Sequence, residues 1–271
     1  MNKSYLKWAG SKSRILQEVL DTFPANIGCY AEPFLGSGTV ALNVTAESKL
    51  LNDLNGDVIL CHETVHKYPE QLLNQLKRLY QLGRESYYHI RTAFNTADLT
   101  AIQKSAAFIY MNKHGYNGLC RYSKNGFNIP VGKSKTIHFP DTEINAFKGN
   151  LGSNIEFLST DFEEFCSMIP NKATVYMDPP YVPKSASNSN INYTGESFTW
   201  IAHTRLRDCI LRLQARGCHV VVSNHDMPVT RQLYKDADEI RSVKAFRSVS
   251  SKNNRGDVDE LLAIYLPKEK I

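Results

Sequence analysis

Short apolar runs that end at turn residues recur along the chain, and they predict the strands of a buried sheet. Several runs are continuous rather than alternating, which is typical of strands that are covered on both faces. The predicted strands are residues 29–33, 49–52, 154–158, 173–177, 219–223 and 261–265. Strands that are spread over the whole chain and separated by helical patterns favour a doubly wound α/β sheet.

A long segment between the second and third predicted strands follows helical spacing instead. Its apolar residues recur every three or four positions, as one face of a helix requires. They are Leu72, Leu73, Leu76, Leu79, Tyr80, Ala106, Ala107, Ile109 and Tyr110. A glycine-rich stretch at 115–132 follows, in which Asn125-Gly126 is a strong hairpin signal. We therefore predict that a mostly helical insertion with a β-hairpin, at 57–144, interrupts the sheet.

Two shorter helices are expected near the N-terminus. Residues 13–22 predict a short helix that ends at Phe23-Pro24. The apolar residues 40–42 predict the start of a second helix, which lies between the first two predicted strands. This order makes a β-loop-α-β unit of the Rossmann kind.

A glycine turn follows the first predicted strand. In Phe34-Leu35-Gly36-Ser37-Gly38 the two glycines allow the backbone to approach a ligand closely. The third glycine of the dinucleotide fingerprint is missing, which makes a pyrophosphate ligand less suitable. Asp53 ends the next strand, where a carboxylate can accept hydrogen bonds from both hydroxyls of a ribose. An adenosine-containing ligand without a large phosphate group, such as S-adenosylmethionine, fits this pattern.

The motif Asp178-Pro179-Pro180-Tyr181 follows the apolar run 173–177 directly. The prolines end the strand, because proline lacks an N–H and has a fixed φ. A carboxylate, a fixed carbonyl and an aromatic ring thus lie together at the carboxyl edge of the sheet, where open α/β sheets bind ligands. This combination suits the amino group and the face of a planar base. The alternative is an ordinary proline-rich turn with an exposed aspartate, which could have the same sequence.

Composition and cysteine usage restrict the class of protein. The 271 residues are 42% hydrophobic and 22% charged, as in ordinary globular proteins. The six cysteines are scattered and form no C-x-x-C pair, which argues against a zinc site and a disulfide framework. The first residues lack the apolar core of a signal peptide, and no run approaches the roughly 20 apolar residues of a membrane span. We expect a cytoplasmic protein.

Charge is unevenly distributed, although the net charge is only +5. No acidic residue lies between Asp98 and Asp141. Cations and aromatic residues alternate there, which favours a surface that follows phosphates and stacks on bases, with a solvated face above core aromatics as the alternative. The cations are Lys104, Lys113, Arg121, Lys124, Lys133 and Lys135, and the aromatic residues are Phe108, Tyr110, Tyr116, Tyr122, Phe127 and Phe139.

The polar run 223–226 comes at the end of another predicted strand. The run contains the residue types of a hydrolase triad, serine, histidine and aspartate. Residues adjacent in sequence, however, rarely face one another as the members of a triad must. We interpret the run as a strand-end turn, with Asn224 and His225 as secondary candidates for substrate contact.

Six motifs in one order give the chain a resemblance to the Dam-type DNA adenine N6-methyltransferases of the α-group, from Lys7 to about Pro267. The order implies a class I methyltransferase fold, with a catalytic S-adenosylmethionine-binding domain at 1–56 and 145–271 and a target-recognition domain at 57–144. The motifs are Lys7-Trp8-Ala9-Gly10-Ser11-Lys12, Glu32-Pro33-Phe34-Leu35-Gly36-Ser37-Gly38, Tyr116-Asn117-Gly118-Leu119-Cys120-Arg121-Tyr122, Asp178-Pro179-Pro180-Tyr181, Ser223-Asn224-His225-Asp226 and Val258-Asp259-Glu260-Leu261-Leu262-Ala263.

The resemblance also implies roles for individual residues. The catalytic positions are Asp178, Pro179, Pro180 and Tyr181. The cofactor positions are Trp8, Lys12, Glu32, Phe34, Gly36, Gly38, Asp53, Asp161, Phe162 and Asp178. The DNA-contacting positions are Lys7, Tyr116, Asn117, Leu119, Arg121, Pro130 and Lys133. The implied cofactor is S-adenosylmethionine, with S-adenosylhomocysteine as product and no metal. The implied partner is double-stranded DNA containing GATC, with no membrane and no obligate protein partner, and a monomer is expected.

Two positions depart from the family pattern. Ser11 stands where the bacterial enzymes usually have glycine, and Lys133 stands where an arginine that contacts the DNA backbone is common. Lysine keeps the charge but loses the bidentate fork, so phosphate anchoring is expected to be weaker.

The mechanism expected from these residues begins with extrusion of the adenine from the duplex. Tyr181 would stack on the adenine, and Asp178 with the Pro179 carbonyl would accept both N6 hydrogens, which points the N6 lone pair at the methyl group for direct in-line transfer. Arg121 is the candidate for a bidentate contact to guanine, with phosphate as the alternative. Lys7 is the candidate for the other guanine.

Tyr116 is expected as a wedge beside the orphaned base, and Leu119 as a contact to a thymine methyl group. Two other functions compete with this interpretation. One is methylation of a different base, cytosine N4 or an RNA base; cytosine enzymes more often carry Ser-Pro-Pro-Tyr, so Asp178 favours adenine. The other is a DNA-binding protein without activity, which would require damage to the cofactor pocket that the sequence does not contain.

Overall fold

The computed structural model describes residues 1–134, 136–182, 198–246 and 257–268, and Lys135 of the basic stretch lies outside them. Contacts divide the chain into two compact units. The first comprises Met1–Ser11, Gly36–Asn43 and Asn55–Gly152, and the second comprises Lys12–Leu35, Val44–Leu54 and Ser153–Ile271. The domain ranges predicted above stay a prediction.

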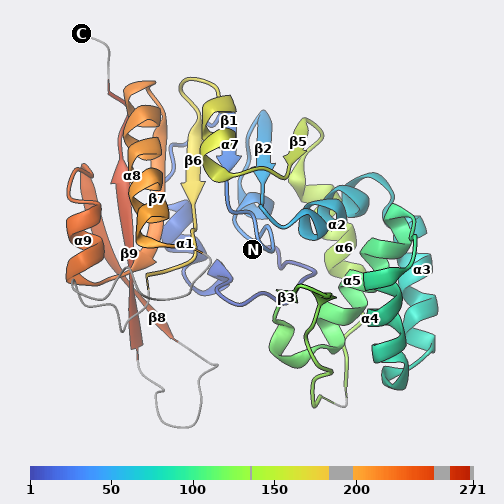
Figure 1. The fold of residues 1–271 in the computed structure, drawn as a ribbon. Coiled ribbons are helices and arrows are strands. Elements are labelled where there is room, and N and C mark those ends of the chain that lie inside the picture. The colour runs from blue at the N-terminus through green and yellow to red at the C-terminus, as the bar shows by residue number, and fades with distance from the viewer. Residues whose placement is uncertain (135, 183–197, 247–256, 269–271) are drawn as a thin grey trace. The chain divides into compact units, whose positions relative to one another are not determined.

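A mixed sheet, seven-stranded in the described part of the chain, forms the second unit (Figure 1). Its strands are β1 (Cys29–Glu32), β2 (Ser48–Asn52), β5 (Ile155–Leu158), β6 (Thr174–Met177), β7 (His219–His225), β8 (Glu239–Phe246) and β9 (Asp257–Tyr265). The strand order is β5-β2-β1-β6-β7-β9-β8, in which β9 pairs antiparallel with both β7 and β8 and the other pairs are parallel. The prediction of a doubly wound, Rossmann-like α/β fold is confirmed.

Helices cover this sheet and bury its central strands. The helices of the second unit are α1 (Leu16–Leu20), α7 (Phe162–Met168), α8 (Trp200–Ala215) and α9 (Pro228–Leu233), with the short 3-10 helix η1 (Lys12–Arg14). Phe165 of α7 and Ile210 of α8 pack with Val175 and Val220 of the sheet in one fully buried cluster. Burial of β6 on both faces explains its continuous apolar sequence.

The structure corrects two expectations for this unit. The strand β8 was missed, because Glu239, Arg241 and Lys244 interrupt its apolar pattern. Charged residues are typical of the edge of a sheet, and β8 is the last strand in the order. The residues 223–225 do not form a turn but continue β7.

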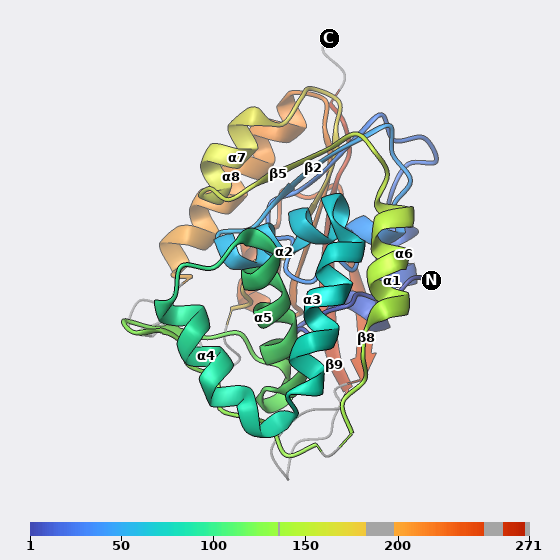
Figure 2. The same ribbon diagram turned by 90° about the vertical axis from the view of Figure 1, so that its right-hand side faces the viewer.

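Helices dominate the first unit, and Figure 2 shows α3, α4 and α5, of which α5 contacts both others. Its elements are the 3-10 helices η2 (Ala41–Asn43), η3 (Arg84–Ser86) and η4 (Tyr116–Gly118), the helices α2 (Gly56–Lys67), α3 (Pro69–Gln81), α4 (Tyr87–Thr96), α5 (Ala101–His114) and α6 (Asp141–Leu151), and the strands β3 (Tyr122–Ser123) and β4 (Gly126–Phe127). The predicted hairpin is confirmed as β3 and β4. Among the described residues, no helix is long and apolar enough to cross a membrane.

The α-helix expected from residue 40 is wrong, since the chain forms only the 3-10 turn η2 there. The side chain of Asn43 explains why the helix stops. Its Nδ2 donates to the carbonyls of Asn2 and Thr39, at 3.0 and 2.9 Å, and its Oδ1 accepts from the amide of Asn2 at 2.7 Å. These bonds tie the turn to the N-terminal segment, and an asparagine that bonds to backbone groups competes with helix continuation.

Candidate functional site

The carboxylate of Asp178 lies directly after β6, at the carboxyl edge of the sheet. Its Oδ2 is 2.8 Å from the ammonium of Lys12, and its Oδ1 accepts a hydrogen bond from the Ser223 hydroxyl at 2.9 Å. Ser223 is fully buried and also bonds the hydroxyl of Tyr176, at 3.0 Å. Both carboxylate oxygens are therefore oriented by neighbouring side chains, and one of them already pairs with an N–H donor.

Val182, which follows the motif, is held against β7. Pro179 is buried and Pro180 is exposed. Asn224 accepts the Val182 amide through its Oδ1, at 3.2 Å, and the Nδ1 of His225 lies 2.9 Å from the Val182 carbonyl. Asn224 and His225, which we considered for substrate contact, thus fix the loop that carries the motif.

The ring of Tyr181 has polar neighbours on several sides. The Lys12 ammonium lies 4.7 Å from the ring centroid, and the His225 ring is in edge contact at 4.8 Å. The phenol donates to Oε2 of Glu260 at 2.8 Å. Burial, and then the charges of Asp178 and Glu260, raise the pKa of the Tyr181 phenol well above its ordinary value. The phenol therefore stays protonated and acts as a donor.

Predicted cofactor residues lie along the same edge of the sheet. Glu32 ends β1, is buried, and accepts the Tyr30 hydroxyl at 2.8 Å. Phe34 and Phe162 approach each other with centroids 5.6 Å apart. Phe198, which the sequence analysis missed, lies 5.8 Å from Phe34 and 5.6 Å from Phe162. These three rings form an apolar wall.

Asn52, also missed from the sequence, connects the loops of this edge. Its Nδ2 donates to the carbonyls of Pro33 and Thr160, at 3.0 and 3.1 Å. Its Oδ1 accepts the Thr160 amide at 3.0 Å, and its own carbonyl accepts the Leu35 amide at 2.8 Å. The predicted ribose ligand Asp53 follows directly, so its backbone position depends on these bonds.

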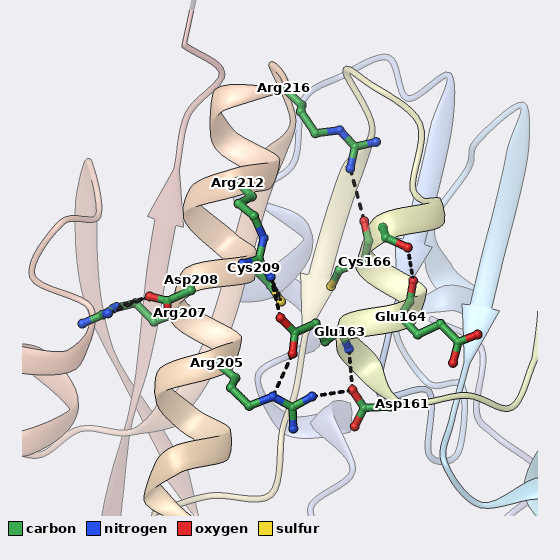
Figure 3. A network of polar contacts seen from close by, with 11 residues as sticks. Asp161, Glu163, Glu164, Cys166, Arg205, Arg207, Asp208, Cys209, Arg212 and Arg216 are labelled. Atoms are coloured by element: carbon green, nitrogen blue, oxygen red, sulfur yellow. Dashed lines mark hydrogen bonds and ion pairs between the residues drawn. The ribbon is translucent and has the colours of Figure 1, made fainter.

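Figure 3 shows that Asp161, which caps the start of α7, is joined to α8 by an ion pair with Arg205, and that Glu163 of α7 is paired with α8 as well. Arg205 donates to Asp161 at 2.9 Å and to Glu163 at 2.8 Å, while Arg212 donates to Glu163 at 2.9 Å. The Arg205 guanidinium also lies 5.0 Å from the ring centroid of Phe162. Arg205 of α8 therefore contacts both predicted adenine-side residues. Exposed pairs of this kind add little stability by themselves.

The two glycines of the glycine turn belong to the first unit and have φ values of +49° at Gly36 and +69° at Gly38. Trp8 packs on Gly36 so closely that a Cβ there would lie 2.7 Å from the indole Nε1. The Gly36 carbonyl is 2.8 Å from the Nε2 of His62. The prediction that this turn needs glycine is consistent with both the positive φ and the close contact, and Trp8, Gly36 and Gly38 remain predicted cofactor residues.

We expect Gly36→Ala to lower the free energy of unfolding by about 1–2 kcal/mol, because alanine is strained at positive φ and would push Trp8 aside. Chemical denaturation measures the effect. Gly149→Ala is the matched control: Gly149 is inside α6, a Cβ there meets nothing within 4 Å, and alanine should stabilise the helix by about 1 kcal/mol. Equal stability of Gly36→Ala and the wild-type protein would contradict the strain.

A cavity of about 230 Å³ in the first unit brings together several predicted DNA contacts. Its lining includes the predicted residues Lys7, Tyr116, Asn117 and Lys133, and it adds Lys113. The lining residues are Lys7, Lys113, His114, Gly115, Tyr116, Asn117, Gly132, Lys133 and Ser134. Three lysine residues in the lining of one cavity suit a ligand rich in hydrogen-bond acceptors or negative charge.

The backbone of Lys7 is fixed next to α5. Asn112 bonds both the amide and the carbonyl of Lys7 at 2.8 Å, and the Lys7 ammonium donates to the Lys113 carbonyl at 3.1 Å. Lys113 is nearly buried, and this burial lowers the pKa of its ammonium to about 8. The sequence identified Lys113 only as one cation of the basic stretch; its place in the cavity depends on the packing of α5.

The remaining predicted DNA contacts lie at or near the hairpin. Tyr116 and Leu119 are exposed, at 44% and 38% of their surface, and are accessible to a ligand. Arg121 is exposed and donates through Nε to the Oδ1 of Asn128, at 2.9 Å. Pro130 accepts the Tyr116 amide through its carbonyl at 2.9 Å, so it supports the turn that carries Tyr116.

Comparison with known proteins adds a family to this geometry. Residues 8–249 match the family model described as D12 class N6 adenine-specific DNA methyltransferase. The chain is 36% identical over 271 residues to the DNA adenine methylase of Vibrio cholerae serotype O1, with 98% of this chain and 96% of the relative covered. It is 35% identical to the DNA adenine methylase of Escherichia coli K12, with the same coverage. The DNA adenine methylase of Haemophilus influenzae is 33% identical, with 97% and 94% covered.

Proposed function

Because the chain belongs to the family of D12 class N6 adenine-specific DNA methyltransferases, we propose that it methylates adenine N6 within GATC sites of duplex DNA. The chain is an adenine-specific DNA methyltransferase by this membership. The target sequence, the extrusion of the adenine and S-adenosylmethionine as donor are the finer parts of the proposal.

The observation that carries the proposal is the environment of Asp178. Its Oδ1 is bonded by Ser223, while its Oδ2 accepts an N–H donor, the Lys12 ammonium. An adenine amino group is also an N–H donor, and the Pro179 carbonyl next to Asp178 offers a second acceptor. Two acceptors on the amino hydrogens draw N6 toward a tetrahedral geometry and localise its lone pair. Positioning and electrostatics then supply most of the rate.

The residues of the second unit fit an adenosine-containing donor. Phe34, Phe162 and Phe198 form an apolar wall that suits a purine, and Asp53 follows β2 where a ribose carboxylate is expected. When bound, S-adenosylmethionine supplies a methyl group on a positively charged sulfur. Asp178 and the Pro179 carbonyl would hold the nucleophile, and the proline-rich loop would exclude water from it.

Target extrusion and recognition are supported by separate observations. Tyr181 is an aromatic ring beside Asp178, as stacking on an unpaired purine requires. In the first unit, Lys7, Lys113 and Lys133 line one cavity, while Tyr116 and Leu119 expose apolar surface. Such a combination of cations and exposed apolar groups suits DNA phosphates and bases.

Labelled methyl transfer tests the proposal. Purified protein is incubated with methyl-labelled S-adenosylmethionine and duplexes that contain GATC or each single-base variant, and the modified base is identified by mass spectrometry. We expect N6-methyladenine, mainly in GATC. Equal labelling of all variants would contradict the target sequence, and N4-methylcytosine would contradict the assignment of the base.

We expect Ser223→Ala to lower kcat about tenfold, because a hydrogen bond to the Asp178 carboxylate is lost and the carboxylate becomes free to rotate. Binding of S-adenosylmethionine, measured by calorimetry, should change little. Ser167→Ala is the control, since the Ser167 hydroxyl is exposed and, within the described ranges, bonds only the Glu164 carbonyl of its own helix. A wild-type kcat in Ser223→Ala would show that this bond does not matter.

A further inference from the structure

The hydroxyl of Tyr181 is bonded by a residue from a distant strand. Glu260 lies in β9, 79 positions along the chain from Tyr181, and accepts the phenol at 2.8 Å through Oε2. β9 is held on both sides, since Glu260 pairs with His225 of β7 and with Val243 of β8. The carboxylate that receives the phenol is therefore mounted on a hydrogen-bonded interior strand.

The bond to Glu260 restricts the ring more than its other neighbours do. The Lys12 ammonium lies 4.7 Å from the centroid of the Tyr181 ring. The centroid of the His225 ring lies 4.8 Å from the same point. These contacts are weakly directional, whereas the hydrogen bond fixes the position of the phenol oxygen. Because a phenol O–H prefers the plane of its own ring, the acceptor also favours one orientation of the ring plane. The Glu260 carboxylate is only 17% exposed, so water competes little for the phenol.

We propose that Glu260 is a positioning residue, which holds the Tyr181 hydroxyl so that the ring presents a fixed plane to the extruded adenine. This inference rests on the proposed function, because the ring needs a fixed plane only if a base stacks on it. A ring that is already fixed loses no torsional freedom when the base arrives, and preorganisation of this kind strengthens capture. The Glu260 carboxylate would act on the base through the Tyr181 ring.

A double-mutant cycle tests the inference. Glu260→Ala and Tyr181→Phe each remove the hydrogen bond while Tyr181→Phe keeps the ring. We expect each to lower kcat/KM for duplex DNA about tenfold, and we expect the double variant to be no slower than either single variant. Glu260→Gln should recover most of the activity, because an amide oxygen also accepts the phenol proton.

Base capture is measured separately, with 2-aminopurine in place of the target adenine. The fluorescence of 2-aminopurine rises when this base is unstacked. Glu260→Ala should reduce this rise, while the calorimetric affinity for S-adenosylmethionine stays within twofold. Thermal unfolding controls for the fold; should Glu260→Ala be unfolded at the assay temperature, Glu260→Gln and Tyr181→Phe decide.

Independent losses that multiply in the double variant, or wild-type activity of Tyr181→Phe, would overturn the positioning role. The proposed function would then still stand, because the wild-type protein would still methylate adenine. If the wild-type protein transfers no methyl group to adenine, the proposed function fails and this inference fails with it.

Discussion

Asp178→Ala is expected to reduce methyl transfer at least about a thousandfold, because it removes the carboxylate that we propose accepts a hydrogen of adenine N6. Steady-state transfer of labelled methyl groups to a GATC duplex measures the loss. The sheet should be preserved, since residue 178 follows the buried strand β6 and is not part of its ladder, although loss of the ion pair with buried Lys12 should lower the free energy of unfolding.

Asp178→Asn provides the matched control. It keeps one acceptor oxygen but loses the charge, so we expect a smaller loss, on the order of a hundredfold. Circular dichroism and thermal unfolding show whether both variants fold. Turnover of a folded Asp178→Ala variant near the wild-type rate would refute the role of the carboxylate.

Arg121→Ala is expected to lower kcat/KM for GATC by about 1–3 kcal/mol, roughly tenfold to more than a hundredfold, and to relax the preference for guanine at one position. The structure gives the physical reason for this choice. Asn128 bonds the Nε of Arg121, and within the described residues the terminal amino groups of Arg121 have no hydrogen-bond partner. An oriented guanidinium with free ends suits bidentate contact to guanine.

Lys124→Ala, in the turn of the same hairpin, is the control for non-specific charge. Lys124 is exposed, and its loss should weaken all sequences by a similar small factor. Steady-state kinetics on GATC and on its single-base variants separate the two effects. If Arg121→Ala weakens every sequence equally, Arg121 contacts phosphate and does not read a base.

The sequence was sufficient to predict those features that depend on the residues of one short segment. Membership of the family, predicted from six motifs, is confirmed. The strands β6 and β7 were predicted because both faces are buried, which leaves a continuous apolar run. β8 was not predicted, because an edge strand must carry charges that hide its pattern.

Hydrogen-bond partners of the site residues that lie in distant strands could not be predicted from the sequence. Ser223 lies 45 positions from its partner Asp178, and Glu260 lies 79 positions from its partner Tyr181. The register of Met177 against Val222 brings Ser223 to the carboxylate, and no local pattern encodes that register. The glycine turn was predicted by its spacing, whereas the end of the following helix depended on the side chain of Asn43.

The carboxamide of Asn52 restricts how this edge of the sheet can be redesigned. It donates to two carbonyls, of Pro33 and Thr160, and accepts one amide, so both of its functional groups are in use. Aspartate would turn a negative oxygen toward two carbonyls, and leucine would leave three backbone groups unpaired inside the protein. Engineering of altered donor selectivity can therefore vary the loops around 33–35 and 160 one residue at a time, provided that position 52 stays asparagine.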